Sequence, residues 1–118
     1  MYSDFLYTNK KLIFTDNQFV MKFKEASFKG WEYAFNNIDE SVNLILEKYN
    51  SQNFIKEELI YEAKQLKNLA YENVDTLGKI DENKVQRIHD LYNIMGLLPR
   101  KIDINDFVYE KNRFQNLF

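Results

Sequence analysis

The stretch Phe19-Val-Met-Lys-Phe-Lys-Glu-Ala-Ser-Phe-Lys-Gly-Trp-Glu-Tyr-Ala-Phe35 decides how this chain folds. Its apolar residues recur at intervals of three and four, at Phe19, Phe23, Ala26, Gly30 and Ala34, with Val20, Ser27, Trp31 and Phe35 beside them. This spacing predicts one amphipathic helix over residues 16–36 whose stripe faces a core. A glycine inside a helix is about 1 kcal/mol less favourable than alanine, so Gly30 indicates that another element passes close to the backbone there.

Further helices are predicted on the C-terminal side of this stretch, over residues 38–49, 54–71, 82–95 and 103–109, because apolar residues again recur at helical intervals. Polar residues that can cap a helix precede each predicted start: Thr15 (with Gln18 as a capping box), Asn37, Asn53, Asp81 and Asp103. Gly78 indicates a turn, and Gly96 a left-handed helix end.

The N-terminal side of this stretch is predicted to contain a strand and no helix. Residues 2–8, Tyr2-Ser-Asp-Phe-Leu-Tyr-Thr8, are short and aromatic, which predicts a strand. Residues 11–14 are predicted as a short connection, with a second extended piece as the alternative. A single strand in a helical chain has no hydrogen-bond partner, so its backbone groups must pair elsewhere. The expected fold class is therefore mainly α, with four to five helices and one N-terminal strand, as one helical part over residues 1–109 and a tail over residues 110–118.

The composition of the chain excludes several kinds of binding site and partner. The chain has 118 residues, of which 45% are hydrophobic and 29% charged, with a net charge of −2, so nothing electrostatic points to DNA, RNA or an anionic membrane. It has no cysteine, which excludes disulfides, thiolate metal sites and cysteine nucleophiles. No apolar run is long enough to span a membrane. The start lacks the features of a signal peptide, so either the protein is cytosolic or Met1 is not its biological start.

The sequence gives no support for catalysis, a cofactor or a metal site. His89 is the only histidine, and without a second histidine or a cysteine a zinc site is not indicated. The carboxylates of Glu57, Glu58 and Glu62 fit a solvated helix face better than an acid–base pair. Asp103 begins a run that lacks the glycine and the closing glutamate of a calcium loop, and a helix cap explains it. The glycines form no phosphate-binding loop.

Four segments together resemble the C-terminal part of periplasmic substrate-binding proteins of the thiamine-pyrimidine-precursor-binding type, also described as thiamine-pyrimidine-synthase-like. The closest resemblance is to the version found in extracytoplasmic sensor domains of bacterial signalling proteins. The segments are residues 2–8, Phe23-Lys-Glu-Ala-Ser-Phe-Lys-Gly-Trp-Glu-Tyr-Ala-Phe35, Leu44-Ile-Leu-Glu-Lys-Tyr-Asn50, and Met95-Gly-Leu-Leu-Pro99 with Ile102-Asp-Ile-Asn-Asp-Phe-Val-Tyr109. The chain departs from the family at Ile38, where relatives often have proline, and no family role transfers to His89.

The resemblance implies a type II periplasmic-binding fold, in which two α/β lobes enclose a cleft for a small organic molecule, often a pyrimidine. This chain would be part of one lobe, and a missing N-terminal half would hold most of the cleft. Tyr2 and Asp4 are the residues expected to line it, as a ring that stacks and a carboxylate that accepts amine hydrogens. Alternatively, Tyr2 and Asp4 only hold the strand in its place in the sheet and do not contact a ligand.

The function expected from this resemblance is solute recognition by an extracytoplasmic sensor or by the solute receptor of an ABC transporter. No nucleic acid is expected as a partner, and alone the chain is expected to form a homodimer through the N-terminal strand and residues up to Phe14. A stand-alone helical protein-interaction module is the second hypothesis. An enzyme related to pyrimidine synthases is the third, although the residues for such chemistry are not in this stretch.

Overall fold

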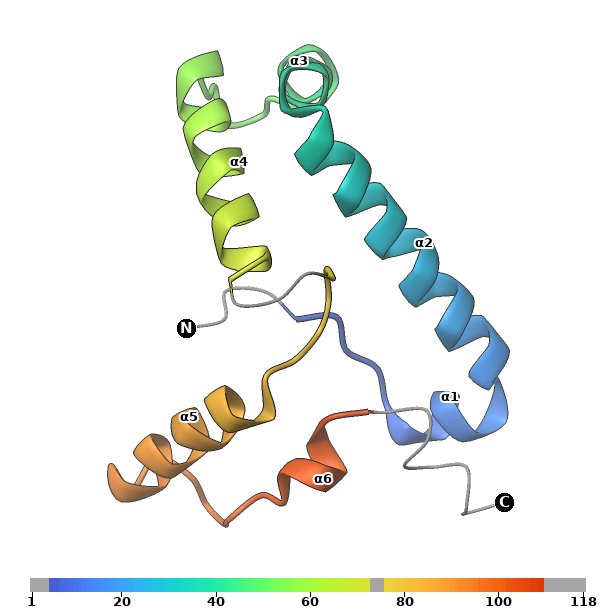
Figure 1. Ribbon diagram of the computed structural model, residues 1–118, viewed down its shortest axis with the longest axis vertical. Helices are drawn as coiled ribbons and strands as arrows, with labels where there is room; N and C mark the ends of the chain where they lie inside the picture. The colour runs from blue at the N-terminus through green and yellow to red at the C-terminus, as the bar shows by residue number, and fades with distance from the viewer. Residues whose placement is uncertain (1–4, 73–75, 110–118) are drawn as a thin grey trace. The chain divides into compact units, whose positions relative to one another are not determined.

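The computed structural model describes residues 5–72 and 76–109, and this part of the chain is mainly helical and contains no strand (Figure 1). It divides into two compact units, one up to Gly78 and one from Lys79. The N-terminal unit holds α1 (Lys10–Thr15), α2 (Asn17–Asn36), α3 (Ile38–Lys48) and α4 (Lys56–Ala70). The C-terminal unit holds α5 (Glu82–Ile94) and α6 (Ile104–Phe107).

The chain before α1 corrects the prediction of a strand. Residues 5–9 have no regular secondary structure, so the strand predicted over residues 2–8 is wrong for residues 5–8, while residues 2–4 lie outside the described part. A strand needs a neighbour for its backbone hydrogen bonds, and the described residues supply none. The carboxamide Oδ1 of Asn9 instead accepts a hydrogen bond from Leu12 N at 2.8 Å and caps α1. Residues 11–14 are therefore helical and not an extended connection.

The start of α2 is also set by local hydrogen bonds. Asp16 Oδ1 accepts a hydrogen bond from Phe19 N at 3.1 Å and caps the helix. Thr15 belongs to α1, and its hydroxyl donates to the Lys11 carbonyl at 2.8 Å. The predicted capping box from Thr15 to Gln18 is therefore wrong, because the threonine hydroxyl is turned toward the preceding helix.

The core of the N-terminal unit lies where α3 packs against both α2 and α4. Phe35 is only 6% exposed, and its ring centroid lies 5.4 Å from that of Trp31 and 6.1 Å from that of Tyr71, edge-on to the latter. Lys67 Nζ on α4 donates a hydrogen bond to the Phe35 carbonyl at 3.1 Å. Together with the buried Val42, these contacts fix the end of α2 against the other two helices. Phe35 thus has a ring neighbour in both Trp31 and Tyr71, while Trp31 stays half exposed.

Of the stripe predicted to face the core, only Phe35 is buried. Phe19 and Phe23 are 53% and 54% exposed, and, apart from its chain neighbours and the adjacent backbone of α2, no atom lies within 4 Å of the place where a Cβ on Gly30 would stand. The close approach expected at Gly30 is therefore absent from the described residues. Such an approach occurs instead at Gly78, which has φ 84° and lies so close to the Phe28 ring that a Cβ there would overlap it. The predicted turn at Gly78 is confirmed.

The starts of α3 and α4 differ from the prediction in how they are capped, since neither Asn37 nor Asn53 caps its helix through its side chain. α4 begins at Lys56 instead of residue 54, because Asn53 adopts φ 56° and Asn50 holds Phe54 outside the helix. The carboxamide of Asn50 accepts from Phe54 N at 2.8 Å and donates to the Phe54 carbonyl at 2.9 Å. Asn37 stands at the start of α3, but its side chain donates back to the Tyr33 carbonyl at 2.9 Å and makes no cap.

Capping in the C-terminal unit follows the prediction. Asp81 accepts hydrogen bonds from Asn83 N and Lys84 N at 3.0 and 3.2 Å and starts α5. Gly96, with φ 70°, follows the end of α5 in the left-handed conformation. Asp103 accepts from Asn105 N at 2.9 Å and starts α6, which ends at Phe107 and is shorter than predicted.

Candidate functional site

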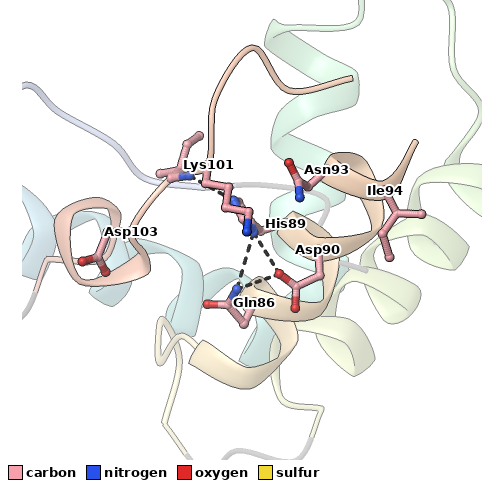
Figure 2. Close-up of a pocket in the computed structure, with 8 residues that line it drawn as sticks. Gln86, His89, Asp90, Asn93, Ile94, Lys101 and Asp103 are labelled. Atoms are coloured by element: carbon pink, nitrogen blue, oxygen red, sulfur yellow. Dashed lines mark hydrogen bonds and ion pairs between the residues drawn. The ribbon is translucent and has the colours of Figure 1, made fainter. Parts of the chain in front are cut away.

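A polar cluster joined by side-chain hydrogen bonds surrounds His89 on α5, in the C-terminal unit (Figure 2). Gln86 and Asp90 lie on the same helix, one turn before His89 and directly after it. The segment that leads to α6 brings Ile102 against the imidazole. His89 is 10% exposed in its side chain, so the segment and the helix together cover most of the ring.

The hydrogen bonds of His89 define its tautomer. The backbone N–H of Ile102 donates to Nε2 at 3.0 Å, so Nε2 carries no proton. The proton of the neutral ring is therefore on Nδ1, which lies 3.0 Å from Asp90 Oδ1 and donates to it. Because Nδ1 is a donor, the amide of Gln86 cannot also donate to it across 3.4 Å, and it donates instead to Asp90 Oδ1 at 2.8 Å.

The carboxylate of Asp90 thus accepts two hydrogen bonds. These bonds, from His89 first and then Gln86, lower the pKa of Asp90 below its ordinary value of 3.8, and the charge of Lys101 acts in the same direction. Asp90 in turn holds the imidazole in the tautomer that accepts the Ile102 amide. The cluster therefore ties the segment before α6 to α5.

An open hollow of about 630 Å³ lies beside this cluster, lined by Gln86, His89, Asp90, Asn93, Ile94, Lys101, Ile102 and Asp103 (Figure 2). Its chemistry is limited, because both ring nitrogens of His89 already have partners within the chain. The imidazole can neither bind a metal through Nε2 nor accept a substrate proton there without breaking the bond to Ile102. Asp103 is used as the cap of α6. The arrangement fits a structural role.

The residues that the sequence predicted as cleft lining, Tyr2 and Asp4, lie outside the described part of the chain. The carboxylates of Glu57, Glu58 and Glu62 are exposed on α4, as expected for a solvated face. Among residues 5–72 and 76–109, no group of histidine and acidic side chains could hold a metal ion.

The sequence pattern assigned no role to His89 and did not predict its bond to the amide of Ile102. Only the carboxylate that follows His89 is visible as a local signal, because the amide that it binds lies thirteen residues further along the chain. A histidine next to an aspartate on a helix does not by itself indicate which backbone group will meet the ring.

No protein-family model, curated protein or solved structure matches this chain. In the part of the chain that the structure describes, no helix combines the length and the apolar character that crossing a membrane requires.

Proposed function

We propose that this chain recognises a small, pyrimidine-like solute as the C-terminal helical part of a two-lobed binding domain, in a sensor or in the solute receptor of an ABC transporter. The proposal includes an extracytoplasmic location and a non-enzymatic role. It rests on the resemblance of the four segments described above, and one structural observation supports it.

That observation concerns the segment before α1. Phe5, Leu6 and Tyr7 are all exposed, and Tyr7 reaches 90%. Leu6, Tyr7 and Thr8 form no backbone hydrogen bond within the described residues. An exposed aromatic run in which residues 6–8 form no backbone hydrogen bond with residues 5–72 or 76–109 is suited to join the edge of a sheet that another polypeptide supplies. In the proposed domain, that sheet belongs to the N-terminal half.

The proposed cleft residues lie just ahead of this run. Once residues 5–8 are held in a sheet, Tyr2 and Asp4 would be carried to the same edge, with the aromatic ring to stack on a heterocycle and the carboxylate to accept its amine hydrogens. The same pairing could join two copies of this chain through the N-terminal segment, but α1 limits it to the residues before Lys10.

The experiment is a titration with the pyrimidine precursor of thiamine, followed by the fluorescence of Trp31, in this chain and in the longest product of its gene. Binding is expected in the longer product. Asp4→Asn should weaken it about tenfold or more, since a hydrogen bond to a charged group is worth about 1.5–3 kcal/mol. Asp39→Asn, which removes an exposed carboxylate from α3, is the matched control and should leave the affinity unchanged.

The alternative is a stand-alone helical module that binds a protein partner and no small molecule. The exposed apolar side chains of α2 favour it specifically, because a helix partner could lie along them. The titration separates the two hypotheses: no fluorescence response in either protein rejects solute recognition and leaves the interaction module.

A further inference from the structure

α2 has a second apolar face, which we call the α2 seam and define as Phe19, Phe23, Ala26, Gly30 and Tyr33. The three aromatic residues of the seam are 53–54% exposed, and the two small ones are exposed as well. The intervals of four, three, four and three residues are those of a heptad repeat, which keeps the seam on one side of the helix over about 21 Å. Figure 1 shows α2 as one uninterrupted helix.

The order of sizes along the seam is self-complementary. Two large rings, Phe19 and Phe23, are followed by two small residues, Ala26 and Gly30. When two copies of α2 are placed antiparallel about a two-fold axis between residues 24 and 25, Phe19 faces Gly30 and Phe23 faces Ala26. Each ring then has a small residue opposite it, as knobs-into-holes packing requires. A parallel pairing would set ring against ring and leave a gap at Gly30.

We propose that the α2 seam is the contact between two copies of this chain, paired antiparallel about that axis. Open space around Gly30 supports this directly, because the structure leaves room for a ring to lie against the helix backbone there. This proposal does not depend on the proposed solute binding, which uses residues before α1.

Charges beside the seam predict how the pair responds to substitution. Lys22 and Lys29 occupy the same flank of α2, and the antiparallel arrangement brings Lys22 of one copy near Lys29 of the other, on both sides of the axis. Glu25 Oε1 lies 3.1 Å from Lys29 Nζ within one copy and offsets part of this repulsion. The wild-type pair should therefore tighten modestly when salt screens the like charges.

The contact is small. An aromatic side chain has a surface of about 150–250 Å². The three half-exposed rings of the seam therefore offer about 300 Å² per copy that pairing can bury. With the small residues and the lysine stems, the pair buries on the order of 1,000 Å² in total, at the low end for a specific interface. A micromolar or weaker association is expected, with monomers predominating at low concentration.

Sedimentation velocity of the intact chain from 1 to 500 µM tests the pairing. Gly30→Leu fills the space opposite Phe19 and should weaken association about tenfold or more. Lys22→Glu replaces two repulsions by two ion pairs and should tighten it about threefold to tenfold. Lys64→Glu makes the same charge change on the exposed surface of α4 and should leave it unaltered. Circular dichroism checks that each variant keeps its helix content.

Cross-linking tests the orientation, because the chain has no cysteine of its own. In the antiparallel pair, the two copies of residue 26 lie within one helical turn of each other along the axis, while the two copies of residue 33 lie about 25 Å apart. A short bismaleimide should therefore join Ala26→Cys copies and not Tyr33→Cys copies. A monomer at every concentration, an association that neither Gly30→Leu nor Lys22→Glu changes, or efficient cross-linking at both positions would overturn the proposal.

Discussion

Replacing phenylalanine by alanine at two positions of α2 gives the sharpest test of which face of this helix forms the core. Phe35 is 6% exposed and touches rings on both sides, whereas Phe23 is 54% exposed. Replacing a buried phenylalanine by alanine lowers the free energy of unfolding by about 3–5 kcal/mol. Phe35→Ala should lie toward the upper end of this range, because it also removes two ring contacts. Phe23→Ala should cost less than about 1 kcal/mol, because little area is lost and alanine favours the helix.

Urea unfolding followed by circular dichroism measures both variants, and Trp31 fluorescence provides a second probe for the wild type and Phe23→Ala. With a slope of about 1–3 kcal/mol per molar urea, Phe35→Ala should lower the midpoint by about 2 M, or leave the N-terminal unit unfolded in water. The protein must be dilute, so that pairing through the α2 seam does not add to the stability of the wild type. Equal losses in the two variants, or a larger loss for Phe23→Ala, would refute the assignment of the buried face.

Other substitutions test local contacts in the same way. His89→Ala should speed hydrogen exchange at the Ile102 amide by about fivefold to tenfold, as expected for the loss of one hydrogen bond, while exchange within α4 stays unchanged. The pKa of Asp90 is lower in the folded chain than in the unfolded chain. The ionised carboxylate therefore stabilises the fold fully above the unfolded pKa, and this contribution is lost as the pH falls through the folded pKa. Asp90→Asn should accordingly flatten the acid side of the profile of unfolding free energy against pH, measured by urea unfolding. Gly78→Ala should destabilise by about 1–3 kcal/mol, because the position combines φ 84° with an overlapping ring, whereas Gly30→Ala should stabilise the dilute monomer by up to about 1 kcal/mol in thermal unfolding. The opposite order for the two glycines would contradict the geometry of both sites.

The helices and several of their ends could be predicted because they depend on neighbours in the sequence. Asp81 caps α5 through amides two and three residues away, and the left-handed turn at Gly96 needs only the absence of a Cβ. The boundaries failed where two local signals compete. Thr15 could cap α2 or bond backward within α1, and the second choice prevails since Asn9 starts a helix that the sequence pattern had not predicted.

The contact between His89 and Ile102 could not be predicted, because it joins groups that only the path of the chain between α5 and α6 brings together. The predicted strand failed over residues 5–8 for a different reason. The aromatic composition of this segment favours a strand locally, but a strand also needs a neighbouring strand for its backbone hydrogen bonds. Residues 5–72 and 76–109 contain no such strand.

The predicted apolar stripe of α2 is buried at Phe35 and exposed at Phe19 and Phe23, and the exposed part is informative. Periodicity identifies apolar positions, and on α2 these positions span more of the helix than one core can cover. The contacts in one copy bury Phe35, whereas Phe19 and Phe23 stay about half exposed and contact each other, with ring centroids 6.2 Å apart. Scattered exposed apolar residues are ordinary on a protein surface, but a heptad seam with small residues in complementary order is not scattered. The pattern of the α2 seam therefore indicates that the seam is buried by something other than the contacts within one copy of the described chain. The effect of Gly30→Leu on association tests whether a second copy buries it.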